Sequence, residues 1–362
     1  MSRNLIVCLD GTNNKYAAQN TNVVKLCAML DRTKPDQLVY YQTGIGTFAP
    51  PGMWNKLQRW FVTRLDLAIA WLLKDHVTGA YKFLMNYYQD GDNVYIFGFS
   101  RGAYSARVLA AMIYKVGLIG EGNEDLVPFA WDIFKKRHSE ENTKQADGFR
   151  HTFGRNIRIK FLGVWDTVSS VGWAWSPKHF EYTQRNPGVD EFRHAVSLDE
   201  RRTYFVQNLW AAPPPSGQNV VEVWFAGVHC DVGGGYKEQE SGLSKLALQW
   251  MVREARNAGL RFNEIAVNII IPKKSTAEYA APDPLAEIHE SLEGLWWIVE
   301  IIPKRIMVKD STQKWTSRWI IPLGRHRFVA EGANVHASVL ARIEGISGYK
   351  PPNLPAKYTV IN

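Results

Sequence analysis

Short apolar runs alternate with longer amphipathic stretches along the chain. Six runs are brief, apolar and rich in β-branched residues, as buried parallel strands are. They cover residues 5–10, 37–42, 93–99, 157–166, 220–229 and 266–271. Residues 64–88 and 242–258 instead show apolar positions spaced three and four apart, which predicts amphipathic helices. Strands that alternate with helices predict an α/β fold with a mostly parallel sheet and helices on both faces.

Polar side chains follow four of these strands at the point where each strand ends. They are Asp10-Gly11-Thr12-Asn13, Ser100, Asp166-Thr167 and His229-Cys230-Asp231. In parallel sheets, ligands and catalytic groups lie at the carboxyl ends of the strands. The pattern therefore predicts one polar site at this edge of the sheet.

The third strand ends in Gly98-Phe99-Ser100-Arg101-Gly102, which has the form G-x-S-x-G, and an Ala-rich helical run follows it. In a nucleophile elbow, this arrangement holds the serine in a strained turn with its hydroxyl exposed. The helix that begins there directs backbone N–H groups toward a developing oxyanion. We expect the backbone N–H of Arg101 to be one oxyanion donor and that of Gly11 or Thr12 to be the other.

A serine hydroxyl needs a base to take its proton, and the base needs a group to orient it. Ser100, Asp166 and His229 stand in the chain order typical of α/β-hydrolase triads. His336, which opens a helical run over residues 337–343, fits the same order and is an alternative base. Asp10, which follows the first strand, could take part in catalysis, or it could instead hold its own loop by hydrogen bonds.

Two other chemistries remain open at the strand ends. Asp231 precedes Gly233-Gly234-Gly235 and could serve a Ser–Asp dyad of the patatin type, although Val232 interrupts that pattern. Asp10, Asp166, His229 and Asp231 could also converge on a divalent metal, which would make the protein a metal-dependent hydrolase. The glycine run lacks the Lys-Ser/Thr of a phosphate-binding loop, so it gives little support for nucleotide binding.

Composition limits the class of protein. The 362 residues carry a formal net charge of +8, and 46% of them are hydrophobic, which is typical of a globular protein with a substantial core. The Lys and Arg residues are dispersed, so we expect no nucleic-acid partner; a solvated basic surface or contact with an anionic membrane fits better. The three cysteines suggest reduced thiols in a cytosolic setting, not a disulfide framework or a metal cluster. We expect no signal peptide, transmembrane helix or cofactor.

Two groups of aromatic residues could contact lipid. Residues 292–308 contain Trp296 and Trp297, followed by Lys304 and Arg305, which suits either an interfacial segment or a buried core helix. The tryptophan-containing pairs and triplet at residues 53–54, 60–61 and 173–175 could form an apolar lid near Ser100.

The motifs together resemble a known family, and the resemblance covers nearly the whole chain. They are Leu9–Asn14, Gly91-Asp92, Gly98–Ala103, Gly163–Val168, Gly227–Tyr236, Val335–Val339 and Asn353–Pro355. They look like the uncharacterised α/β-hydrolase family that includes the catalytic domains of type VI secretion phospholipase effectors. The resemblance implies a Ser-Asp-His esterase and supports Ser100, Asp166 and His229 at matching positions.

The sequence therefore predicts an α/β-hydrolase-like catalytic domain over residues 1–362. Residues 281–362 would be a C-terminal elaboration packed on it. The expected activity is hydrolysis of carboxylic esters, of lipids or phospholipids, through an acyl-serine intermediate. The alternatives are a metal-dependent hydrolase and a catalytically silent interaction protein on the same scaffold.

Overall fold

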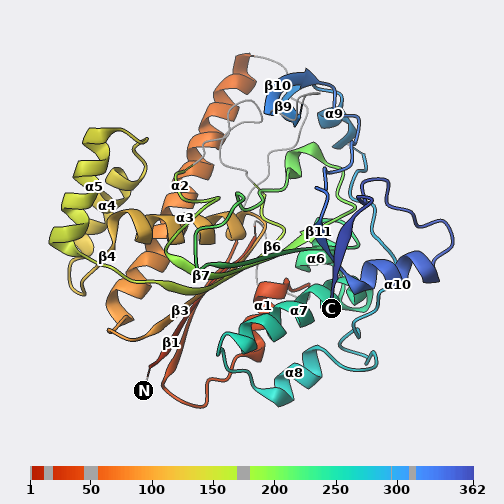
Figure 1. The fold of residues 1–362 in the computed structure, drawn as a ribbon, viewed down its shortest axis with the longest axis horizontal. Helices are drawn as coiled ribbons and strands as arrows, with labels where there is room; N and C mark the ends of the chain where they lie inside the picture. Colours follow the sequence, from red (N-terminus) through yellow and green to blue (C-terminus); the bar gives the residue numbers. More distant parts are fainter. Residues whose placement is uncertain (1, 12–18, 45–55, 169–179, 295, 310–314) are drawn as a thin grey trace.

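Among the described residues, eight parallel strands form the centre of the molecule (Figure 1). The computed structural model describes residues 2–11, 19–44, 56–168, 180–294, 296–309 and 315–362. The strands lie in the order β12-β11-β8-β7-β6-β3-β1-β2, and each neighbouring pair is parallel. Their bounds are Asn4–Leu9 (β1), Gln37–Gln42 (β2), Asn93–Phe99 (β3), Ile159–Trp165 (β6), Val189–Ser197 (β7), Asn219–Phe225 (β8), Ala333–His336 (β11) and Tyr358–Ile361 (β12).

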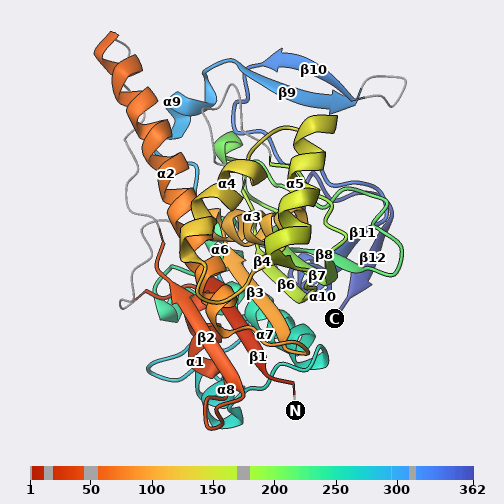
Figure 2. The same cartoon turned by 90° about the vertical axis from the view of Figure 1, so that its left-hand side faces the viewer.

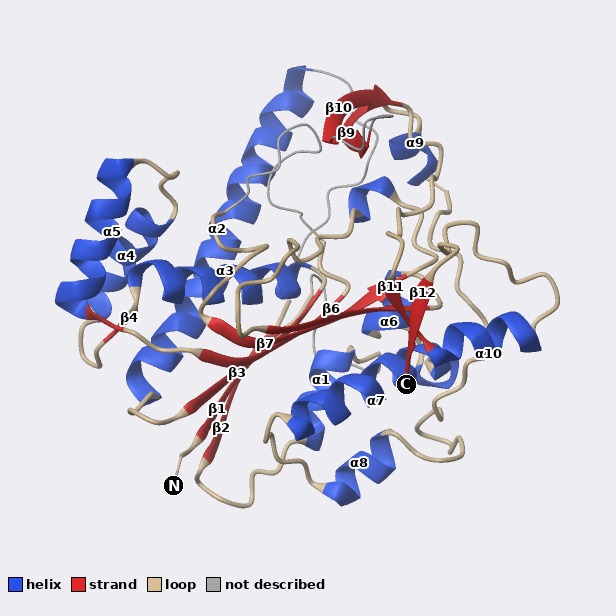
Figure 3. Ribbon diagram, viewed as in Figure 1, coloured by secondary structure: helices blue, strands red, loops and turns tan. Residues whose placement is uncertain are grey.

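Helices cover both faces of the sheet (Figures 1 and 3). Because side chains alternate along a strand, Leu5, Val7 and Leu9 of β1 join one core, and Ile6 and Cys8 join the other. The first core includes residues of α2 (Lys56–Tyr87), α3 (Arg101–Val116), α4 (Val127–Phe134) and α5 (Glu140–Phe153). The second includes residues of α1 (Asn22–Met29), α7 (Gly242–Asn257) and α8 (Glu264–Ile270). The predicted α/β fold is confirmed.

The strand order changes direction at β1. From β1 the chain passes outward to β2 on one side, and then returns to β3 on the other side. Loops that leave the carboxyl ends of two such strands diverge and create the crevice where α/β proteins bind ligands. Ser100 follows β3, and Asp10 and Gly11 follow β1, so the elbow lies at this point.

The structure differs from the sequence prediction at several elements, among them α8 and β7. Residues 266–271 were expected to form a strand, but residues 266–270 belong to α8 and Ile271 is its C-cap. The Asn263 side chain accepts hydrogen bonds from the amides of Ile265 and Ala266 and so caps a helix. Ile269, within the expected strand, is 51% exposed, which a buried strand would not allow. The pattern also missed the central strand β7, whose sequence VDEFRHAVS mixes charged and apolar residues.

The segment 292–308 does not form the buried core helix that was one of the two expectations for it. Its described residues contain the short helix α9 (Trp296–Glu300) and most of β9 (Lys304–Lys309), which pairs antiparallel with β10 (Trp315–Ile320). In Figures 1 and 2 this hairpin and α9 lie at one end of the molecule, and α8 lies at the opposite end. Among the described residues, no helix is both long and apolar enough to cross a membrane.

Residues beyond 281 complete the sheet. After the hairpin, β11 pairs with β8 and is followed by α10 (Ala337–Gly345), and β12 then pairs with β11. Val335 of β11 and Val339 of α10 are fully buried with Trp224 of β8 in a third apolar cluster. The smaller elements are the antiparallel pair β4 (Leu118–Ile119) and β5 (Gly154–Arg155), the 3₁₀ turns η1 (Glu124–Leu126), η2 (Thr203–Phe205) and η3 (Glu238–Glu240), and α6 (His229–Gly233).

Candidate active site

Ser100 occupies a tight turn between β3 and α3. Its backbone has φ 59° and ψ −121°, a conformation that L-residues adopt only under strain. The turn needs glycine on both sides. A Cβ at Gly98 would lie 2.5 Å from the carbonyl oxygen of Gly102, and one at Gly102 would lie 2.1 Å from that of Leu9. The two glycines therefore let α3 pack directly against β3 and β1.

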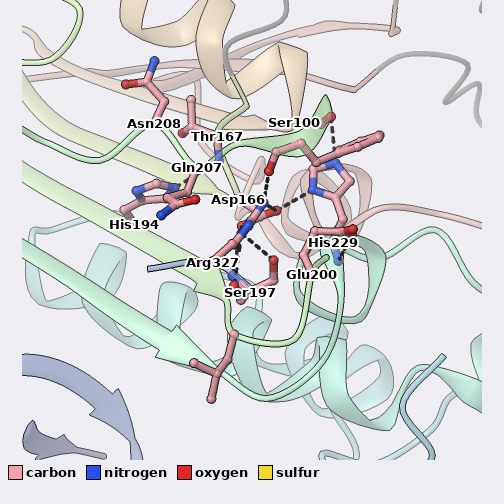
Figure 4. A network of polar contacts seen from close by, with 12 residues as sticks. Ser100, Asp166, Thr167, His194, Ser197, Glu200, Gln207, Asn208, His229 and Arg327 are labelled. Carbon is pink, nitrogen blue, oxygen red and sulfur yellow. Dashed lines mark hydrogen bonds and ion pairs between the residues drawn. The ribbon is translucent and has the colours of Figure 1, made fainter. Parts of the chain in front are cut away.

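His229 begins α6 just beyond the end of β8 and reaches Ser100 (Figure 4). Its Nε2 lies 2.8 Å from Ser100 Oγ, and its Nδ1 lies 2.5 Å from Asp166 Oδ2. Two rings flank the imidazole, with centroids 4.6 Å away for Phe99 and 4.8 Å away for Phe205. These contacts fix the plane of the ring between a hydroxyl and a carboxylate.

Asp166 follows β6 and is completely buried. Its φ is 36°, so this residue also adopts a left-handed backbone conformation. Besides His229, its carboxylate accepts hydrogen bonds from the Ser197 amide, at 2.9 Å, and from two nitrogens of Arg327, at 2.6 and 3.0 Å. Every one of these contacts favours the ionised form of the carboxylate.

The electrostatic environment keeps the two groups in complementary states. Burial lowers the pKa of His229 below its ordinary value, although Asp166 opposes this shift. Burial alone would raise the pKa of Asp166, but Arg327 and His229 outweigh that effect and hold the pKa well below its ordinary range. At neutral pH the pair is therefore a neutral imidazole hydrogen-bonded to a carboxylate, the state in which the ring can accept a proton from Ser100.

The expected oxyanion donors have different outcomes. Arg101 is the first residue of α3 and directly follows Ser100, so its amide lies in the first turn of the helix. The amide of Gly11 instead donates to Asp10 Oδ1 at 2.6 Å and is engaged by that carboxylate. Thr12 lies outside the described residues. Of the three expected oxyanion donors, the Arg101 amide remains the candidate among the described residues.

His336 and Asp231, which were alternatives for activating Ser100, contact other partners. His336 caps α10 through Ser338 and stacks on Phe225, with ring centroids 4.5 Å apart. Asp231 accepts hydrogen bonds from the Val228 amide at 3.0 Å and lies 2.6 Å from Nδ1 of His289. Neither therefore joins Ser100 in a hydrogen-bonded pair in this structure.

The four residues considered as metal ligands do not form a cluster. The Asp10 carboxylate accepts hydrogen bonds from Thr21 Oγ1 at 2.8 Å and from the Tyr41 hydroxyl at 3.0 Å, so it braces the loop after β1. Within the described ranges, no group of three or more His, Cys, Asp or Glu side chains is arranged to hold a metal ion. The groups considered for an apolar lid, at residues 53–54, 60–61 and 173–175, lie outside the residues whose side chains are described.

Three charged residues near the site were not found from the sequence. Glu200 accepts a hydrogen bond from the His229 amide and forms an ion pair with Arg202, whose guanidinium lies 3.9 Å from the centroid of the Phe205 ring. Burial alone would raise the pKa of Glu200, but Arg202 lowers it to about 2. Arg327 is the third residue. Glu200 and Arg202 lie shortly after the end of β7, and that placement is the one sequence signal that could have suggested a role in the site. Because β7 was not predicted, the signal could not be used.

Comparison with known proteins gives the family. Residues 3–254 match the family model described as "T6SS, Phospholipase effector Tle1-like, catalytic domain". The chain belongs to this family. The resemblance expected from the motifs is confirmed, and the Tle1-like domain spans β1 to α7, including Ser100, Asp166 and His229. Family membership indicates a hydrolase that acts on lipid esters.

Individual relatives are more distant. The chain is 26% identical to the uncharacterized protein YEL023C of Saccharomyces cerevisiae, across 98% of this chain and 80% of the yeast protein. A crystal structure of an uncharacterized protein from Pseudomonas aeruginosa is similar over 79% of this chain, with 22% identity and a TM-score of 0.45. The Tle1 effector bound to the VgrG spike of the type 6 secretion system is similar over 67%, with 18% identity and a TM-score of 0.39. The matches span 50% and 52% of those two solved chains, about half of their length.

Proposed function

We propose that this Tle1-like domain is a serine esterase that hydrolyses carboxylic ester bonds of lipids or phospholipids. The observation that carries the proposal is the continuous hydrogen-bonded chain from Ser100 Oγ through His229 to Asp166. The strained turn at Ser100 supports the same role, because strained backbones of this kind recur at nucleophilic serines.

In the proposed reaction, Ser100 Oγ attacks the ester carbonyl carbon while His229 Nε2 takes the hydroxyl proton. The tetrahedral intermediate places its oxyanion near the start of α3, where the Arg101 amide would donate to it. The intermediate then expels the alcohol, which leaves with the proton from His229. Water attacks the acyl-serine carbonyl while His229 takes a proton from it. The second tetrahedral intermediate then releases the carboxylic acid as its bond to Ser100 Oγ breaks, and Oγ recovers the proton from His229.

A substrate panel tests this function. Acetyl, medium-chain and long-chain esters and a phosphatidylcholine would be compared for the wild-type protein and Ser100→Ala. We expect hydrolysis of the longer-chain substrates, and a loss in kcat on the order of 10⁶-fold in the variant. Hydrolysis that survives in Ser100→Ala, or that a chelator abolishes in the wild type, would overturn the serine mechanism. No hydrolysis of any ester by the folded protein would favour a silent interaction protein.

We also propose that the protein contacts an anionic membrane through α9 and Ile301 and through residues 319–323, at the end of β10 and just after it. Apolar side chains here are exposed: Trp297, Ile298, Ile301, Trp319, Ile321 and Leu323. Trp296, on the same short helix, packs against Phe205 at 5.6 Å between ring centroids, and Phe205 packs against His229. A lipid surface bound here would therefore adjoin the site, and the net charge of +8 favours anionic lipid.

Vesicle binding tests the membrane contact separately from catalysis. Trp297→Ser/Ile301→Ser would be compared with Ile265→Ser/Ile269→Ser, which removes two exposed apolar side chains from α8 at the opposite end of the molecule. We expect sedimentation with phosphatidylcholine–phosphatidylglycerol vesicles to fall several-fold in the first variant only. Equal binding by both variants would show that this surface does not contact the membrane.

A further inference from the structure

Arg327 contacts the candidate site although it belongs to none of the sequence motifs. It lies in the loop between β10 and β11, and its side chain is buried. One terminal nitrogen donates to Asp166 Oδ1 and to the carbonyl and hydroxyl oxygens of Ser197. The other donates to Asp166 Oδ2 at 3.0 Å and to the carbonyl oxygen of Phe205 at 2.5 Å. The guanidinium thus joins Asp166 to Ser197 at the end of β7 (Figure 4). Through the Phe205 carbonyl it also contacts the turn that carries the Phe205 ring.

This residue reaches the site from a distant part of the chain. Arg327 lies 161 positions after Asp166 and beyond the 3–254 range of the family match. Its position is itself fixed, because the Asn353 side chain donates to both the Arg327 and Leu198 carbonyl oxygens. Val329, two residues later, is buried in the third apolar cluster. The C-terminal segment therefore holds the Arg327 guanidinium in a fixed position against the Asp166 carboxylate.

We propose that Arg327 is a positioning residue for the reaction proposed above, because its guanidinium holds the Asp166 carboxylate in the orientation that meets His229 Nδ1. This inference rests on the proposed function. It also means that the site is incomplete without the C-terminal segment of the chain.

The geometry explains how the residue would act. Asp166 Oδ1 accepts from Ser197 and Arg327, and Oδ2 accepts from His229 and Arg327. A two-pronged contact blocks rotation of the carboxylate, which a single hydrogen bond would allow. Arg327 also neutralises part of the charge that Asp166 presents to His229. The carboxylate therefore orients the imidazole without raising its affinity for protons as strongly as an unpaired aspartate would.

The pH dependence of the site follows from the charged and titratable groups near His229. Asp166 after β6 and Glu200 and Arg202 after β7 act on the imidazole directly. Cys230 and Asp231 are its neighbours in α6, Tyr236 follows α6, and Arg327 acts through Asp166. Removing Arg327 exposes His229 to the uncompensated charge of Asp166. Proton affinity of the imidazole should rise, so the acid limb of kcat/KM should move to higher pH.

Three variants of the full-length protein test the proposal. For Arg327→Met we expect kcat/KM to fall on the order of 10²-fold, from loss of orientation, and the acid-limb midpoint to rise by about one pH unit. Arg327→Lys keeps the charge but loses the two-pronged contact, so it should restore the midpoint and only part of the rate. The matched control is Arg193→Met. Arg193 is also a buried, ion-paired arginine, but its side chain bonds to residues of β7, β8 and α7, with Glu191 and Glu254 as its ionic partners.

A readout without substrate separates this proposal from the proposed function. The His229 imidazole would be titrated by NMR in histidine-labelled protein, with its signal assigned by its absence in His229→Gln. An upward shift of the His229 titration in Arg327→Met, but not in Arg193→Met, is expected whether or not a substrate has been found. If both variants lose activity only in proportion to their folded fraction, with unchanged midpoints and titrations, Arg327 is merely structural. Failure of the proposed function would instead appear as an inactive wild-type protein.

Discussion

At the scale of single residues, the surroundings of His229 determine how the site would respond to pH. The imidazole lies between two aromatic rings and is almost completely buried, and burial lowers its pKa below the ordinary value of 6.5. A general base must be neutral, so activity should rise with pH as His229 loses its proton. We therefore predict that kcat/KM has an acid-limb midpoint below about 6.5. A midpoint above about 7 in a pH–rate profile would contradict this assignment.

The two histidines considered for the base make a matched pair. His229→Ala removes the group that bonds Ser100, and we predict a loss in kcat on the order of 10⁶-fold. His336→Ala removes a helix cap and a stacked ring far along the chain, so it should cost about 1 kcal/mol of stability and leave the rate unchanged. Rates normalised to the folded fraction would distinguish them. Equal rate losses in the two variants would contradict the account.

Single residues also show what the sequence could and could not predict about the site. Ser100, Asp166 and His229 were found because each closes or follows an apolar strand, and parallel strands end at one edge. Arg327 was missed because it lies in a loop without a strand or motif beside it. Only the fold brings it to Asp166 across 161 positions. The engagement of the Gly11 amide by Asp10 was equally invisible, because it depends on the rotamer of one side chain.

At the scale of elements, the elbow depends on the close approach of α3 to β1. A methyl group at Gly102 would meet backbone oxygens of Leu9 and Asp10, at 2.1 and 2.5 Å, so strand or helix must move. We predict that Gly102→Ala lowers the free energy of unfolding by about 1–3 kcal/mol and reduces activity. Urea denaturation and ester hydrolysis would measure the two effects.

Gly148 supplies the control for that prediction. It lies inside α5, where a Cβ would have no neighbouring atom within 4 Å, and alanine is a better helix former than glycine. Gly148→Ala should therefore raise the free energy of unfolding by about 0.5–1 kcal/mol without changing activity. Destabilisation of equal size in both variants would show that close packing at the elbow is not what Gly102 provides.

The elements also show where reading a sequence by pattern fails. Five of the six expected strands are present. The apolar runs of β1, β3 and β6 are buried on both faces of the sheet, whereas the edge strand β2 is mostly half-buried. Residues 266–271 are also a short apolar run like those strands. They follow Asn263, however, whose side chain caps a helix, and this local capping favours a helix over a strand. Strand β7 was missed because its charged residues, including Arg193, find partners in Glu191 and Glu254 that only the folded chain supplies.

At the scale of the whole molecule, the C-terminal segment both extends the sheet and supplies Arg327. Val335 of β11 is fully buried between β8 and β12, and its register partner Val360 on β12 is 46% exposed. We predict that Val335→Ala lowers the free energy of unfolding by about 2 kcal/mol. Val360→Ala should change it by less than about 0.5 kcal/mol. Urea denaturation of both variants checks this, and equal effects would contradict the buried role of β11.

The central claim is that the fold gathers Ser100, His229 and Asp166 into one nucleophilic site. Its most direct test is covalent labelling of the full-length protein by a fluorophosphonate, with the modified residue located by mass spectrometry. We predict one label per molecule on Ser100, absent in Ser100→Ala and on the order of 10³-fold slower in His229→Ala than in His336→Ala. A folded protein that remains unlabelled, or that is labelled at the same rate in His229→Ala, would contradict the account.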